Sequence, residues 1–314
     1  MSGYAEQVLV CTGEDDWPSR IEEESGGDNL AADLKELFGR GGVYSDVRCP
    51  CPAPLTRKLT QRQPFHNISV LNASLPSSVP PRAEVQSTSA YLLPSFKYVP
   101  FLPRVSFDSV QALAKGYLLP ERLHSAHDGL SPIHRDRLTR KEAYRSLLPG
   151  VRDVRDVLVL VCGHGGRDAR CGVMGPLLRD EFEGCLEREG VSVLRGPVEV
   201  DLTGEARRLE AAPGGDGAGE EDGGAAAQTT TTARVALISH IGGHKFAGNV
   251  IVYVPPGQRL EDGSAHPLAG YGIWYGRVEP RHVEGLVRET VLRGRVVEDM
   301  FRGGIDAQRR IMRL

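Results

Sequence analysis

The clearest hydrophobic pattern lies in residues 151–314. It consists of several continuous apolar runs and one long segment whose apolar residues recur at helical spacing. Residues 156–162 form a continuous apolar, Val-rich run, DVLVLVC, which is typical of a strand buried on both faces. Residues 172–190 have apolar side chains at helical spacing and end at a glycine, so a helix is predicted there. Apolar segments predict further strands at VSVL and VEVDL (191–202), at 233–240, at 249–255 and at 272–278.

Residues 279–294 read as an amphipathic helix that begins at a proline and ends at a glycine. A strand, a helix and a strand, followed by more strands and a terminal helix, predict an α/β layer fold of thioredoxin type. The sheet is expected to be mixed, with helices on its faces.

The first 150 residues show a weaker pattern. Strands are predicted at 7–13 and 67–75, a capped helix in DWPSRIEEES (16–25) and another helix within 106–123. Prolines between 75 and 104 predict long surface loops, and PAPLTRKLTQRQP (52–64) also reads as a loop. LTRKEAYRSLLPG (138–150) is predicted to be a helix ending at Pro-Gly, which places a domain boundary there.

Two domains are therefore expected, an N-terminal α/β domain at 1–150 and a thioredoxin-like domain at 151–314. The second domain is interrupted by residues 204–232, which are rich in Gly, Ala, Thr and acidic residues and contain few large apolar ones. Such a composition buries too little surface to offset its ordering entropy, so a disordered insertion is predicted. No internal repeat stands out in the sequence.

Charge, hydrophobicity and cysteine content argue against several classes of protein. A net charge of -3 over 314 residues gives no reason to expect nucleic acid, and no apolar run approaches the ~20 residues that span a bilayer. The start, MSGYAEQVLVCTG, has neither a secretory signal nor a transit-peptide composition. Six cysteines are too few for a disulfide scaffold and suit a reducing compartment, where clustered cysteines are metal ligands or catalytic thiols.

Two motifs combine cysteine and histidine. VCGHGGRDARCG (161–172) holds Cys162 at a predicted strand end and Cys171 before a helix, and SHIGGHKFAGN (239–249) holds His240 and His244. The Gly-Gly pair between the histidines allows the chain to turn back toward the strand end. Two thiolates and two imidazoles suit zinc or an iron–sulfur cluster, while two unrelated loops are the alternative.

The other cysteines and His164 are weaker candidates for metal ligands. The cysteine spacing is too wide for a zinc finger, and the second half of a Rieske motif is absent, which makes His164 a loop or supporting residue. Cys49 and Cys51 read as loop thiols, and Cys11 and Cys185 as core residues.

The stretches CGHGGRDARCG, SHIGGHKFAGNVIVY, GIWYGRVEP and FRGG together resemble the sucrase/ferredoxin-like family, also called thioredoxin-like ferredoxins. This resemblance implies a [2Fe–2S] cluster with Cys162 and Cys171 on one iron and His240 and His244 on the other. It also implies single-electron transfer in redox homeostasis between donor and acceptor proteins whose identity is unknown. VLVCTGEDDWPSRIEEE and VLRGRVVEDMFRGG further resemble a fungal, mitochondrial branch of the family.

That branch implies a mitochondrial location, in the matrix or the intermembrane space, with the cytoplasm as the alternative because no presequence is visible. Two alternative functions remain open: a thiol oxidoreductase acting in redox quality control, and a structural zinc-binding interaction module. Whether the chain is an enzyme is equally open.

A cluster with two thiolates and two neutral imidazoles has zero net charge when oxidised, which raises its potential above that of a four-cysteine cluster. Histidine ligands would also couple the electron to a proton.

Overall fold

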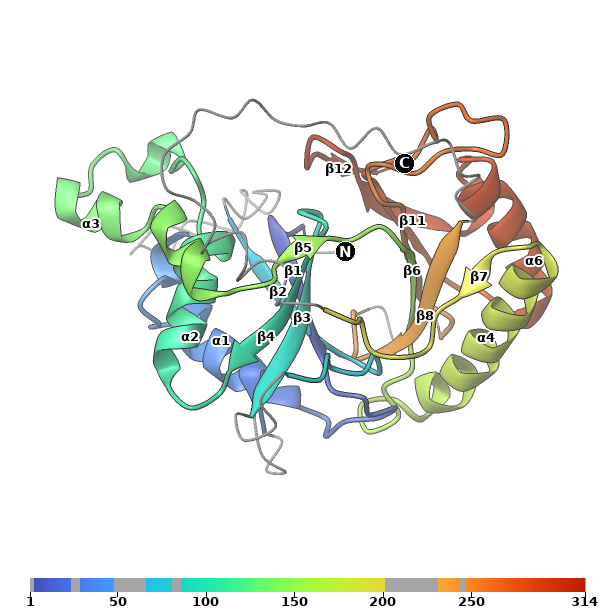
Figure 1. The fold of residues 1–314 in the computed structure, drawn as a ribbon, viewed down its shortest axis with the longest axis horizontal. Coiled ribbons are helices and arrows are strands. Elements are labelled where there is room, and N and C mark those ends of the chain that lie inside the picture. Colours follow the sequence, from blue (N-terminus) through green and yellow to red (C-terminus); the bar gives the residue numbers. More distant parts are fainter. Residues whose placement is uncertain are drawn as a thin grey trace, which may run out of the picture.

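The computed structural model describes residues 3–23, 29–47, 66–80, 86–200, 231–242 and 247–313. These residues form a mixed α/β fold, which confirms the predicted fold class (Figure 1). The predicted loop at 52–64 and most of the predicted insertion at 204–232 lie outside the described residues. No helix in the described part of the chain is long and apolar enough to cross a bilayer.

The strands and helices up to residue 150 are β1 (Glu6–Cys11), α1 (Leu30–Phe38), β2 (Ile68–Ala73), β3 (Ser87–Leu93), β4 (Lys97–Pro103), α2 (Phe107–Leu113) and α3 (Pro132–Arg137). A π-helical segment, Ala114–Leu118, continues α2, and short 3-10 helices lie at Ile21–Glu23, Ser45–Val47, Ser125–His127 and Glu142–Leu147. Helix α1 begins because the Asn29 side chain accepts a hydrogen bond from the Ala32 amide at 2.9 Å.

The elements after residue 150 are β5 (Arg152–Asp153), β6 (Val157–Cys162), α4 (Ala169–Arg188), β7 (Ser192–Val193), β8 (Thr232–Ile238), β9 (Val250–Tyr253), β10 (Gly272–Tyr275), α6 (Pro280–Leu286), β11 (Phe301–Ile305) and β12 (Ile311–Met312). A π-helical segment, Val287–Leu292, continues α6, and a 3-10 helix covers Glu298–Met300.

One twelve-stranded sheet runs through both halves, in the order β12-β11-β10-β9-β6-β8-β2-β1-β3-β4-β5, with β7 beside β8. Strands β6 and β8 are parallel, β9 is antiparallel to β6, and β10 is antiparallel to β9. Strands β1 and β2 are likewise parallel, with β3 antiparallel to β1 and β4 antiparallel to β3. Each half is therefore a β-α-β unit followed by two antiparallel strands and a helix.

The two halves thus repeat one arrangement, although the sequence shows no repeat. They meet where β2 and β8 pair in antiparallel fashion at Ala73 and Ile238. The contact is reciprocal: the Ser74 amide donates to Leu237 O and the Ser239 amide to Asn72 O, both at 2.9 Å. Their hydroxyls accept from the amides of Leu237 and Asn72 at 2.9 and 3.0 Å. This seam brings the ends of β6, β8 and β1 to the same region.

Three clusters of buried side chains lie on the faces of the sheet. Helices α4 and α6 cover the outer face of the C-terminal half, and α1 and α2 cover the outer face of the N-terminal half (Figure 1). A central cluster joins the inner faces of both halves, with Leu9 and Tyr91 from one side and Leu158, Tyr253 and Trp274 from the other. Alternate residues of β6 and β1 enter opposite clusters, so these strands are buried on both faces.

Several element predictions were wrong. The proline-containing region predicted to be surface loop contains β3 and β4 instead. Pro100 of β4 lies opposite a register shift between Thr88 and Ala90, and Pro103 is the last residue of β4. Of the helix predicted at 16–25, the described residues 16–23 form only the 3-10 turn Ile21–Glu23, because Asp16 and Ser19 are held by contacts with the loop after β6. The helix predicted at 138–150 is the 3-10 helix Glu142–Leu147.

The strand predicted at VEVDL is not formed at 198–200, and residues 201–202 lie outside the described part. The segment assigned to the insertion ends sooner than predicted, because Thr232 already belongs to β8. The domain boundary at residue 150 remains a prediction.

Candidate metal centre

Three of the four predicted ligands converge. The ligand atoms of Cys162, Cys171 and His240 all lie within 4.8 Å of one another. Cys162 is the last residue of β6, Cys171 lies in the first turn of α4, and His240 follows β8. The Cys162 sulfur is 3.9 Å from Nδ1 of His240, and both sulfurs are buried. His244, the fourth predicted ligand, lies outside the described residues.

Glycines let helix α4 approach the loop that follows β6. A side-chain carbon on Gly175 would lie 2.5 Å from the Gly163 Cα, and one on Gly172 would lie 2.7 Å from the Gly165 Cα. These two glycine–glycine contacts hold the start of α4 against the loop, where Asp168 caps the helix by accepting from the Arg170 amide at 3.0 Å. Cys171 is thereby placed beside Cys162.

His164 fixes the backbone at His240. This histidine is 1% exposed and uses both ring nitrogens. Its Nδ1 accepts from the His240 amide at 3.0 Å, so Nε2 carries the proton and donates to the carbonyls of Trp17 and Pro18 at 3.0 and 2.9 Å. His164 is therefore a supporting residue, as the sequence indicates, and it connects the strand end of β8 to the loop that follows β1.

The loop after β1, residues 12–19, docks on the cysteine loop. The Gly166 amide donates to the Asp16 carboxylate at 3.0–3.1 Å, and Arg167 donates from Nη1 to the carbonyl and hydroxyl of Ser19 at 3.3 and 3.2 Å. Gly166 has no room for a side chain, since a Cβ there would lie 2.2 Å from Trp17 O. The N-terminal half thus forms one wall of the centre.

The two thiols of the centre are electrostatically coupled. The hydrogen bond with Cys171 lowers the pKa of Cys162, and the same bond raises the pKa of Cys171 above its ordinary value. Backbone hydrogen bonds from Ile241 and His164 also lower the pKa of the Cys162 thiol. Cys162 is therefore favoured as the thiolate, and Cys171 keeps its proton and donates it to the Cys162 sulfur in a hydrogen bond. A metal ion that binds both sulfurs has to displace that remaining proton.

The structure also places the remaining cysteines and several other residues of the motifs. Cys11 and Cys185 are buried in the core, as predicted, and Trp274 and Tyr275 are core residues too. Arg170 pairs with Asp168 at 2.8 Å. Gly242 has a φ of 89°, the left-handed backbone that the predicted turn after His240 requires. Lys245, Cys49 and Cys51 lie outside the described residues.

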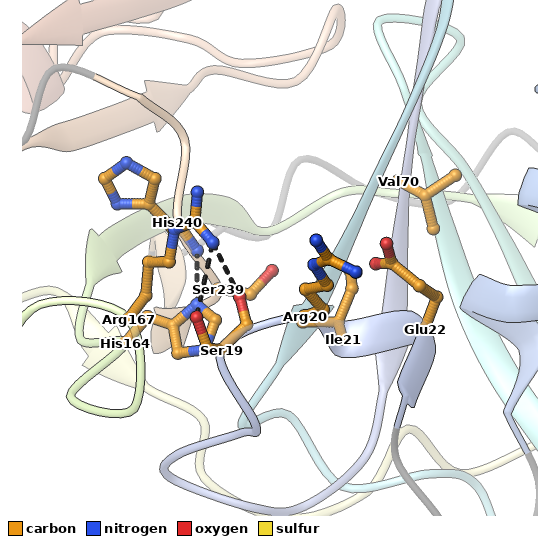
Figure 2. Close-up of a pocket in the computed structure, with 9 residues that line it drawn as sticks. All are labelled: Ser19, Arg20, Ile21, Glu22, Val70, His164, Arg167, Ser239 and His240. Atoms are coloured by element: carbon orange, nitrogen blue, oxygen red, sulfur yellow. Dashed lines mark hydrogen bonds between the residues drawn. The ribbon is translucent and has the colours of Figure 1, made fainter.

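A cavity of about 300 Å³ opens beside the centre. Figure 2 shows its walls, with Arg20, Ile21, Glu22 and Val70 on one side and His164, Arg167, Ser239 and His240 on the other, where Ser19 is hydrogen-bonded to Arg167. Its lining consists of Ser19, Arg20, Ile21, Glu22, Val70, His164, Arg167, Ser239 and His240. Sequence patterns alone do not reveal this cavity, because its two walls come from different halves of the chain.

A sequence profile of the sucrase/ferredoxin-like family matches residues 1–303. The chain belongs to the sucrase/ferredoxin-like family. This match covers both halves of the fold and confirms the predicted resemblance.

Curated relatives carry the name altered inheritance of mitochondria protein 32. The one from Meyerozyma guilliermondii is 28% identical over 263 residues, which are 81% of this chain and 73% of the relative. The one from Debaryomyces hansenii is 27% identical over 293 residues, covering 93% and 77% of the two chains. The one from Clavispora lusitaniae is 36% identical over 146 residues, covering 46% and 34%. The predicted similarity to a fungal branch named for mitochondria is thereby confirmed, and no solved structure is a significant match.

Proposed function

We propose that this member of the sucrase/ferredoxin-like family holds a [2Fe–2S] cluster and transfers single electrons in redox homeostasis. Cys162 and Cys171 would bind one iron, and His240 and His244 the other. The observation that carries the proposal is the convergence of two buried cysteines and one histidine within 4.8 Å, from three separate segments. Thiolate and imidazole are the donors that iron–sulfur clusters and zinc use in proteins.

The cluster, when bound, would supply a one-electron couple of raised potential, because histidine ligands make it less negative than four thiolates do. The chain's own residues would set how that couple behaves. Burial of both sulfurs keeps water from the thiolates, and His164 holds the His240 backbone in place. The 12–19 loop shields the centre from the side of the N-terminal half.

A structural zinc ion is a second candidate, and one distance favours it. Donors on a single tetrahedral zinc, with Zn–S of about 2.3 Å and Zn–N of about 2.0–2.1 Å, lie roughly 3.5–3.8 Å apart. The separation of 3.9 Å between the Cys162 sulfur and Nδ1 of His240 is close to that value. Donors on opposite irons need a wider separation, so loading a cluster would move His240 away from Cys162.

The thiol oxidoreductase alternative has less support. Reactive cysteines are generally partly exposed, so that a second thiol can reach the sulfur. Both Cys162 and Cys171 are 0% exposed. Attack by the thiol of another protein would require the centre to open first.

Metal and sulfide analysis of anaerobically purified protein separates the two metal candidates. A cluster predicts a red-brown protein with iron and acid-labile sulfide in equimolar amounts. A colourless protein with one equivalent of zinc and no sulfide would contradict it. Mössbauer spectroscopy of iron-57-labelled protein would then test whether the two iron sites differ, as unequal ligand pairs require.

We also propose a mitochondrial location, in the matrix or the intermembrane space. The support is the name of the relatives, which refers to inheritance of mitochondria. Subfractionation of cells that produce the tagged full-length protein tests it. Recovery in the cytosolic fraction alone would contradict the proposal.

A further inference from the structure

Two arginines face the cavity beside His240 from opposite walls. Arg20 belongs to the 19–22 segment of the N-terminal half, and Arg167 to the loop after β6 (Figure 2). The cavity measures about 300 Å³, the small end of the usual range for ligand pockets. Its contents are therefore limited to a small molecule or one terminal group of a larger one.

Arg167 has no carboxylate partner among the described residues. Its hydrogen bonds run from Nη1 to the carbonyl and hydroxyl oxygens of Ser19, which are neutral acceptors. An arginine side chain offers five N–H donors in a planar fork that matches an oxyanion, so most of that capacity is unused here.

The carboxylates near the cavity are engaged elsewhere. Glu22, the one acidic residue in the lining, forms an ion pair with Lys35. Glu23 pairs with Arg20 at 2.8 Å, on exposed side chains where such a pair contributes little. Asp16 accepts hydrogen bonds from the amides of Trp17 and Gly166. The positive charge of Arg167 in the cavity lining is therefore not neutralised by any carboxylate of the described residues.

We propose that this cavity binds a small oxyanion, a carboxylate or phosphate group, with Arg167 as its main contact and Arg20 closing over it from the opposite wall. The inference goes beyond the proposed function, because such binding requires neither iron nor zinc. Since His240 lines the same cavity, a ligand held there would lie next to the centre. The 12–19 loop, fixed by Asp16 and His164, keeps the two walls at a constant spacing.

Isothermal titration calorimetry of the full-length protein, with inorganic phosphate and with succinate as probes, tests this proposal. Saturable binding of at least one probe is expected, and the stronger of the two identifies phosphate or carboxylate as the preferred group. Arg167→Gln should raise the dissociation constant of the probe at least about tenfold, because it removes a charge-assisted, bidentate contact. Arg20→Gln should weaken binding to a smaller extent.

Arg188→Gln is the matched control, since Arg188 is an exposed arginine at the far end of α4, paired with Glu181. It should bind the probe as the wild type does. All three positions are exposed, so each variant should fold, and circular dichroism checks this. Absence of saturable binding with both probes, or wild-type affinity in Arg167→Gln, would overturn the proposal. Calorimetry does not depend on the metal content, so failure here and failure of the cluster assignment are distinguishable.

Discussion

At the residue scale, the candidate metal centre depends on Cys162 and Cys171 as its two thiolate donors. Cys162→Ser and Cys171→Ser should each abolish or severely weaken metal loading, because serine is a poor ligand for soft metals. Cys185→Ala is the matched control, since Cys185 is a buried cysteine on the same helix as Cys171. Metal analysis of the purified variants measures the effect. Wild-type metal content in both serine variants would mean that the ligands lie elsewhere.

Histidine ligation also predicts a pH-dependent midpoint potential. A ligating imidazole can lose its second ring proton, and ferric iron lowers the pKa of that proton relative to ferrous iron. Between the two pKa values the potential should fall by about 59 mV per pH unit, one proton per electron. A redox titration from mildly acidic to alkaline pH, followed optically, measures the slope.

Replacing one histidine ligand provides the comparison for that titration. His240→Cys should lower the potential, because a third anionic thiolate is added to those of Cys162 and Cys171, and should reduce the pH dependence. A flat wild-type profile across the whole range would contradict histidine ligation.

Residue types and spacing alone predict part of this centre. Cys162, Cys171 and His240 could be found because each stands at the end of a recognisable strand or the start of a helix. Asp16 and Ser19 were missed as parts of the site, since their partners Gly166 and Arg167 are about 150 residues away in the sequence. Long-range contacts of that kind leave no periodic signal, and only the sequence resemblance of the 8–24 stretch marked the segment.

At the element scale, the position of α4 depends on its glycine contacts with the cysteine loop. Gly175→Ala should destabilise the protein by about 1–3 kcal/mol, the usual effect of overpacking, because its Cβ would lie 2.5 Å from the Gly163 backbone. Gly184→Ala on the same helix is the control, as the nearest atom is the flexible end of Arg188 at 3.3 Å. That substitution should be neutral or stabilising by up to about 1 kcal/mol. Chemical denaturation measures both, and equal stability of the two variants would refute the packing argument.

Elements with strong apolar runs were predicted correctly, and elements that depend on tertiary contacts were not. Strand β6 is a short, Val-rich apolar run of strand length, and helix α4 has apolar residues at helical spacing over twenty residues. Strand β4 contains two prolines, which normally interrupt a sheet. Pro100 lies opposite the register shift between Thr88 and Ala90, and Pro103 is the last residue of the strand. A bulge is set by the pairing strand, so a single strand's sequence does not reveal it.

At the scale of the whole molecule, the two halves share the central cluster. Leu158, Leu160, Tyr253 and Trp274 face side chains of the N-terminal half across it. Residues 151–314 produced alone should therefore expose this apolar surface and fail to give a stable, soluble protein. Size-exclusion chromatography and thermal unfolding of the fragment test this. A monomeric fragment that unfolds cooperatively at the full-length temperature would show that the second half is independent.

The repeated arrangement of the halves explains why the centre lies at the seam. The pairing of Ala73 with Ile238 places the loop after β1 beside the loop after β6, and only the second of these loops carries the cysteine pair. The N-terminal half then acts as a wall through Asp16 and Ser19. Sequence comparison between the halves did not detect the repeat, because the strands share little beyond their apolar character.

Nitrogen hyperfine spectroscopy of the chemically reduced protein tests the cluster with histidine ligands most directly. The full-length protein is labelled with nitrogen-15 histidine, purified anaerobically, reduced and examined by pulsed electron paramagnetic resonance. We predict the signal of a reduced [2Fe–2S] cluster with nitrogen-15 couplings from histidine, and loss of one of these couplings in His240→Cys. A reduced protein that gives no such signal, or a cluster signal without histidine nitrogen coupling, would contradict the assignment.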